Sequence, residues 1–156
     1  MPDLAASWEP LSDAPGWRFH LREGLAFPSG RIFTASDVLY SYNRVCRPEN
    51  ASPTAWAFED VVGFRAIRSG TGESLIGVRA LSERVVEIEL SEPSASLLAR
   101  LTMPVARIVD REEVEKKGNR YGRAPRGLGA NSASQSHFYS MSQNPSSQKW
   151  EKAIMS

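Results

Sequence analysis

The chain has 156 residues, of which 41% are hydrophobic and 24% are charged, and this composition suits one globular domain, or one domain with a tail. The 19 basic and 18 acidic residues give a net charge of +1 and are spread along the chain, which argues against a basic stripe for binding nucleic acid. No apolar run approaches the ~20 residues needed to span a bilayer, which argues against insertion into a membrane.

Two further features bear on redox chemistry and location. The single cysteine, Cys46, excludes an intramolecular disulfide, and its place on a predicted apolar helix face favours a buried, unreactive thiol. The first residues, Met1 to Leu4, carry neither the basic nor the apolar part of a signal peptide. Taken alone, this start predicts a cytoplasmic chain.

The first elements in chain order are two strands. Turn-forming residues at 12–16 separate Trp8 from Trp17, which predicts an antiparallel pair. In the second strand Trp17, Phe19 and Leu21 alternate with polar residues, as in a strand with one buried face.

After a glycine-rich turn the spacing of apolar residues changes to that of a helix. Thr34 is the predicted N-cap, and Asp37 at the third helical position can reach back to it, as in a capping box. Pro48 cannot continue the helix and ends it. The predicted apolar face consists of Val38, Leu39, Tyr42, Val45 and Cys46.

The next part of the chain predicts a short helical turn at 55–58 and then a small antiparallel meander over 61–90. The meander is expected to have a weak strand at 62–67, a strand at 76–81 and a strand at 85–90.

Helical signals dominate the following residues. Residues 93–101 predict a second helix with its leucines on one face, and 105–109 predict a short strand. Asp110 and Gly118 are the predicted caps of a third helix. Together the patterns predict an α+β fold, in which a small antiparallel β-sheet carries two to three packed helices.

A longer motif links these elements to a known family. The residues from Trp17 to Val38 read Trp-x-Phe-x-Leu-Arg-x-Gly-x-x-Phe-x-x-Gly-x-x-Phe-Thr-Ala-x-Asp-Val. This string resembles the family 5 extracellular solute-binding proteins, the peptide, dipeptide and nickel-chelate receptors of bacterial ABC importers. Matching patterns from Pro2 to Glu9 and from Gly77 to Leu90 extend the resemblance to about Pro125.

The resemblance implies a domain organisation. Residues 1–125 resemble part of such a protein, mainly its intermediate domain, in the periplasmic peptide-binding class called type II or cluster C. In the family this segment follows a signal peptide and earlier strands, so Met1 is expected to be an internal start or the start of a gene model begun too late. Residues 126–156 form a polar, serine-rich segment, which predicts a disordered C-terminal tail.

The resemblance also implies a function and a set of binding residues. Full-length relatives capture a peptide or small organic solute outside the cytoplasmic membrane, between two lobes, and deliver it to ABC permease subunits. Trp56 matches an aromatic that reaches the cleft in relatives, although an ordinary core position is an equal alternative. A second contact is expected at Met103, Pro104 and Val105. Nickel-chelate receptors place an arginine where Val105 stands, so peptides or other organic solutes are favoured here.

Enzyme chemistry finds no support in the sequence, and no catalytic residue, cofactor or metal site is expected. His20 lies on the polar side of a predicted strand, and His137 lies in the tail. No cluster of His, Cys, Asp and Glu has the spacing of metal ligands, and no phosphate-binding loop or nucleophile motif occurs. Three alternatives stay open: the solute-sensing module of a transcriptional regulator, a truncated gene product without function, and a small hydrolase of unrelated activity.

Overall fold

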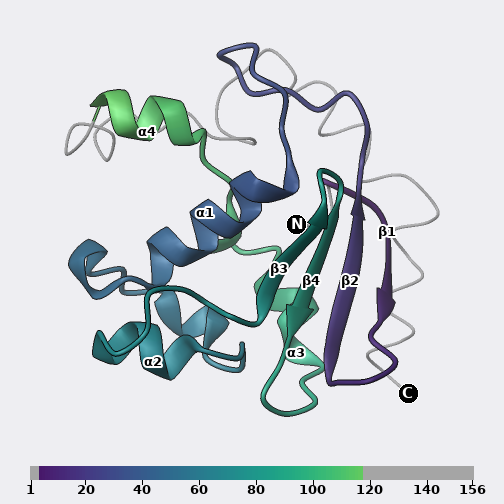
Figure 1. Ribbon diagram of the computed structural model, residues 1–156, viewed down its shortest axis with the longest axis vertical. Coiled ribbons are helices and arrows are strands. Elements are labelled where there is room, and N and C mark those ends of the chain that lie inside the picture. The colour runs from purple at the N-terminus through teal and green to yellow at the C-terminus, as the bar shows by residue number, and fades with distance from the viewer. Residues whose placement is uncertain (1–3, 118–156) are drawn as a thin grey trace.

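The computed structural model describes residues 4–117, which form one antiparallel sheet with helices packed against it (Figure 1). The sheet has four strands in the order β1-β2-β4-β3, with β1 at Ala5–Pro10, β2 at Gly16–Leu21, β3 at Val78–Ser82 and β4 at Val85–Glu89. This arrangement confirms the predicted α+β class and the antiparallel pairing of the first two strands, in which Trp8 lies opposite Phe19.

The described residues form four α-helices and three short 3₁₀ helices. The α-helices are α1 at Ala35–Cys46, α2 at Phe64–Ser69, α3 at Ser96–Arg100 and α4 at Arg111–Lys117. The 3₁₀ helices are η1 at Pro48–Asn50, η2 at Ala55–Phe58 and η3 at Pro104–Ala106. The first, second and third predicted helices correspond to α1, α3 and α4, and the predicted helical turn at 55–58 is η2.

The alternation of residues along the strands separates a buried face from a charged face. Phe19 pairs with Val86 on the buried face, where both side chains are fully covered. On the other face Arg18 lies opposite Glu87 and donates a hydrogen bond to it at 2.7 Å. Paired residues on neighbouring strands share a face of the sheet, so this register places Phe19, Val86 and Ile88 toward the helices.

Helix α1 supplies the other half of the core, as its predicted apolar face requires. Val38, Tyr42 and Cys46 are fully buried, and the ring of Tyr42 lies 4.6 Å from that of Phe58 in η2. Burial raises the pKa of the Tyr42 hydroxyl far above its ordinary value. Burial also raises the pKa of the Cys46 thiol to about 12, and the position confirms the predicted burial of this cysteine.

An ion-pair network fixes the start of α1 against the start of α4. Arg31 donates to Asp37 at 2.5 Å and to Asp110 at 3.0 Å, and Ser29 donates to the same Asp110 carboxylate. Asp37 also accepts the backbone N–H of Thr34 at 2.9 Å, as the predicted cap requires. The loop between β2 and α1 is therefore tied to two helices that lie far apart in the sequence.

Two predicted strands are wrong. Residues 62–67 were expected to be extended, but 64–69 form α2, because Gly63 and Gly70 bracket the segment with φ values of 90° and 74°. A glycine with left-handed φ interrupts extended backbone and also caps a helix C-terminus. Residues 105–109 begin with η3 instead of a strand, because Pro104 presets a helical φ and Ala106 donates to the carbonyl of Met103.

One of the two predicted caps of the third helix, Asp110, lies among the described residues. Asp110 accepts the backbone N–H of Glu112 at 3.1 Å, so it caps α4 as predicted. Gly118 and the predicted tail at 126–156 lie outside the described residues.

Candidate functional site

Trp56 is held at the surface by buried neighbours. It lies in η2, where Ala55, Ala57 and Phe58 are buried and anchor the turn to the core. Trp56 itself is 47% exposed, so the alternative of an ordinary core residue is wrong. An exposed indole on a rigid turn offers a large flat surface to a partner molecule.

The other predicted contact segment surrounds η3. Met103 precedes it and is half-buried, Pro104 is exposed, and Val105 is half-buried with its side chain against the core. The segment therefore presents a small apolar surface on a turn whose backbone is fixed by its own hydrogen bonds.

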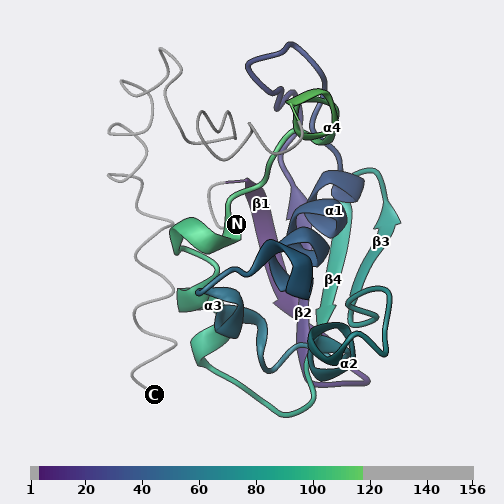
Figure 2. The ribbon, with the colours of Figure 1, turned by 90° about the vertical axis from the view of Figure 1, so that its left-hand side faces the viewer.

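Arg100 joins these two segments. It is the last residue of α3, is 8% exposed, and donates to Asp60 and to Glu59, which directly follow η2. The carbonyl of the same Arg100 accepts the N–H of Met103 at 3.0 Å. Helix α3 packs against η2, and Figure 2 shows the two side by side on the helical side of the sheet. Arg100 thus ties the residues that follow Trp56's turn to α3, the helix that leads into residues 103–105.

The positive charge of Arg100 is balanced by Asp60. Burial alone would raise the pKa of Asp60, but hydrogen bonds from Ser94 and Arg100 and the positive charge of Arg100 outweigh it and lower the pKa. Asp60 is therefore ionised at neutral pH and compensates the buried guanidinium. Consequently, the residues that follow η2 carry a neutralised ion pair instead of an isolated charge.

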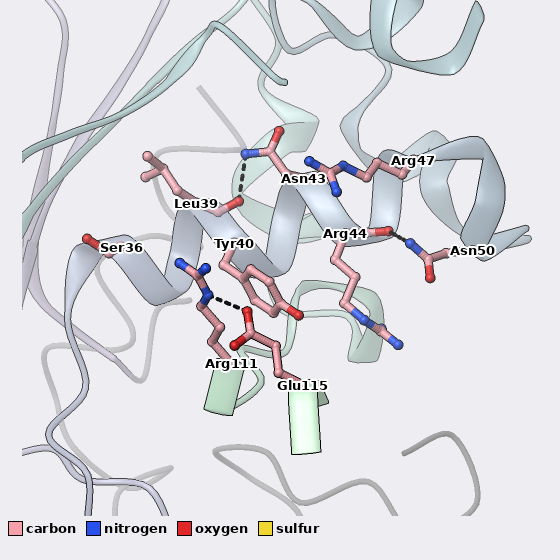
Figure 3. A pocket seen from close by; sticks show the side chains of 9 residues that line it. All are labelled: Ser36, Leu39, Tyr40, Asn43, Arg44, Arg47, Asn50, Arg111 and Glu115. Atoms are coloured by element: carbon pink, nitrogen blue, oxygen red, sulfur yellow. Dashed lines mark hydrogen bonds and ion pairs between the residues drawn. The ribbon is translucent and has the colours of Figure 1, made fainter. Parts of the chain in front are cut away.

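The sequence analysis did not predict the groove that lies on α1. A groove of about 600 Å³ lies between α1 and α4 and contains Tyr40, Arg44, Arg47 and Arg111 (Figure 3). The sequence placed Arg44 and Arg47 at the end of a helix, where they complement its dipole. Their helical spacing from Tyr40 was visible in the sequence, but the approach of Arg111 depends on tertiary structure.

Chemistry-bearing residues elsewhere are dispersed. Within residues 4–117, no three His, Cys, Asp or Glu side chains gather as a metal site would require. His20 is a half-exposed strand residue whose ring nitrogen lies 3.5 Å from Glu9. No helix in this part of the chain is long and apolar enough to cross a lipid bilayer.

Comparisons with known proteins agree on one group. Residues 1–132 match the family model described as bacterial extracellular solute-binding proteins, family 5 middle. The periplasmic oligopeptide-binding protein OppA of Salmonella typhimurium is 33% identical over 77% of this chain, and OppA of Escherichia coli is 32% identical over the same share. Di/tripeptide-binding protein 2 of Pseudomonas aeruginosa is 30% identical over 83% of the chain.

Solved structures show the same relationship. OppA of Haemophilus influenzae in complex with the peptide RPPGFSPFR superposes with a TM-score of 0.70 and 26% identity, over 76% of this chain and 24% of that one. Peptide-bound OppA of Listeria monocytogenes gives the same values. The chain spans 22% of the length of the two OppA relatives and 26% of the Pseudomonas protein. On the family match and the shared fold, the chain belongs to the bacterial extracellular solute-binding proteins of family 5.

Proposed function

We propose that this chain supplies one wall of the solute-binding component of an ABC importer, which holds a peptide or similar organic solute outside the cytoplasmic membrane. The observation that carries the proposal is the exposed Trp56 of η2, since Asp60 after this turn binds Arg100 of α3, the helix that leads into Met103–Val105. The relatives named above are oligopeptide-binding and di/tripeptide-binding proteins, and the two solved OppA structures hold peptides.

Binding in this proposal is non-covalent and depends on shape. The indole of Trp56 stacks on a peptide bond or ring, and Val105 gives an apolar contact where an arginine would grip a carboxylate. The face therefore selects uncharged portions of a solute. An opposing lobe closes over the solute, and the permease subunits receive it. The periplasmic names of several relatives support a location outside the cytoplasm.

A chimera tests the proposal. Residues 4–117 replace the matching segment of Escherichia coli OppA, and titration calorimetry measures the affinity for mixed tri- to pentapeptides. We expect the chimera to bind peptides and Trp56→Ala to weaken binding about tenfold, because aromatic anchors dominate such interfaces. Leu81→Ala is the matched control, because Leu81 is an exposed apolar residue of β3, outside the proposed wall.

Two results would contradict the proposal. One is a folded chimera without peptide affinity, and the other is an equal loss of affinity in the Trp56 and Leu81 variants. The 156-residue chain by itself is expected to bind the same peptides more weakly than the chimera, because it offers only one wall of the cleft.

A further inference from the structure

The groove between α1 and α4 gathers positive charge around one tyrosine. Tyr40 and Arg44 are four residues apart on one face of α1, and Arg47 follows as its C-cap and lines the same groove. Arg111 approaches from α4, with its guanidinium 5.6 Å from the centre of the Tyr40 ring. We call the cleft lined by these four residues the arginine groove (Figure 3).

The pKa of the Tyr40 hydroxyl depends on the charged side chains around it. Burial is the main reason that its pKa is raised, and the charges of Arg44, Arg111 and Arg47 oppose this rise while that of Glu115 adds to it. Glu115, the acidic residue of the lining, accepts a hydrogen bond from Arg111 at 2.7 Å. The lining residues thus sum to a net positive charge.

Arg47 is the arginine best placed to receive a ligand. Its backbone N–H caps α1, but within residues 4–117 its side chain makes no hydrogen bond or ion pair, and it is exposed. Residues 4–117 as a whole contain 14 basic and 16 acidic side chains, so their net charge is negative while that of the groove lining is positive. The local excess of guanidinium groups therefore contrasts with the rest of the described chain.

From this geometry we infer that the arginine groove binds an acidic segment of a partner protein, in extended conformation, through its carboxylates. Guanidinium forks match carboxylate oxygens in two-point hydrogen bonds. The distance along α1 from Tyr40 to Arg47 is ~10 Å, which three extended residues cover.

Two other occupants fit less well. Nucleic acid needs a longer basic stripe than three arginines on a chain segment whose net charge is negative. The chain's own residues 118–156 carry five basic residues and one acidic residue, so their charge repels the groove. The inference is independent of the proposed solute site, which uses Trp56 and residues 103–105.

Fluorescence anisotropy on the full 156-residue chain tests the inference with labelled hexaglutamate, labelled hexaglutamine and single variants. We expect hexaglutamate to bind, hexaglutamine not to bind, and added salt to weaken the binding. Arg47→Gln should weaken it about twofold to fivefold, the range expected for one exposed ion pair. Glu115→Gln should strengthen it, because it removes the carboxylate that competes for Arg111.

Arg65→Gln is the matched control, because Arg65 is an exposed arginine on α2, outside the groove. The inference is overturned if hexaglutamate does not bind, or if Arg65→Gln weakens binding as much as Arg47→Gln does. It is also overturned if polyphosphate or oligothymidylate binds more tightly than hexaglutamate, since the groove would then be a phosphate site. Circular dichroism confirms that each variant is folded.

Discussion

Arg100 of α3 donates to the carboxylate of Asp60, a residue 40 positions earlier that follows directly on η2. The backbone carbonyl of Arg100 accepts a hydrogen bond from the N–H of Met103. Arg100 therefore makes hydrogen bonds toward both of the proposed solute-contacting segments. Local turns alone could not place these segments together, because the intervening residues form α2, β3 and β4.

The first prediction concerns this ion pair. Asp60→Asn should destabilise the chain by about 1–3 kcal/mol, because it leaves the largely buried guanidinium of Arg100 without its main counter-charge. Glu59→Gln is the control and should cost less than about 1 kcal/mol, because Glu59 is exposed and its contact with Arg100 is longer. Urea denaturation measures the free energy of unfolding of both variants. An equal loss of stability in the two would show that Asp60 is not the main counter-charge of Arg100.

A second prediction concerns acid stability. Burial alone would raise the pKa of Asp110, but hydrogen bonds from Ser29 and Arg31 and the charge of Arg31 outweigh it and lower the pKa below its ordinary 3.8. A lowered folded-state pKa adds stability that is complete above the unfolded pKa and is lost as the pH falls through the folded pKa.

The wild-type advantage over Asp110→Asn should therefore be constant from neutral pH to about pH 5 and shrink below pH 3.8. Urea midpoints measured across this range test the sign. An advantage that grows as the pH falls would contradict the network described for Arg31.

The third prediction concerns the Cys46 thiol. With its pKa raised to about 12 and its side chain fully buried, it should react with a thiol reagent only after the chain opens. Labelling should be slow in native buffer and fast in urea, at a rate that follows the unfolded fraction. Rapid labelling of the native chain would show that the end of α1 opens locally.

The fourth prediction compares two glycines with left-handed φ. Gly63→Ala should be the more damaging change, because an added Cβ would lie 2.9 Å from the backbone nitrogen of Ile76. Gly24 has a similar φ of 70° but open space around it, so Gly24→Ala should cost only the conformational penalty of ~1–2 kcal/mol. Thermal unfolding compares them, and equal losses would argue against close packing at Gly63.

The sequence was most informative where pattern and capping agree. Phe19 and Val86 lie on predicted alternating strands, Asp37 completes the predicted capping box of α1, and Asp110 caps α4 as predicted. It misled at 62–67, because a weak alternation over six residues fits one and a half helical turns equally well. The backbone conformation of Gly63 decides between the two, and composition does not reveal it.

The candidate site was also predictable from the sequence only in part. Family resemblance singled out Trp56 and Val105, and the structure adds that Trp56 is exposed and that Arg100 joins its segment to 103–105. The arginine groove could not be predicted, because Arg47 and Arg111 lie on separate helices whose packing depends on long-range contacts such as Arg31 with Asp110.

Hydrogen exchange on the chimera with OppA is the most direct test of the proposed wall. With saturating peptide, amides of residues 55–58 and 103–106 should exchange more slowly than in the free chimera, while those of the β3–β4 hairpin stay unchanged. Unchanged exchange in both segments, with peptide demonstrably bound, would contradict the assignment of Trp56 and Met103–Val105 as the solute-facing wall.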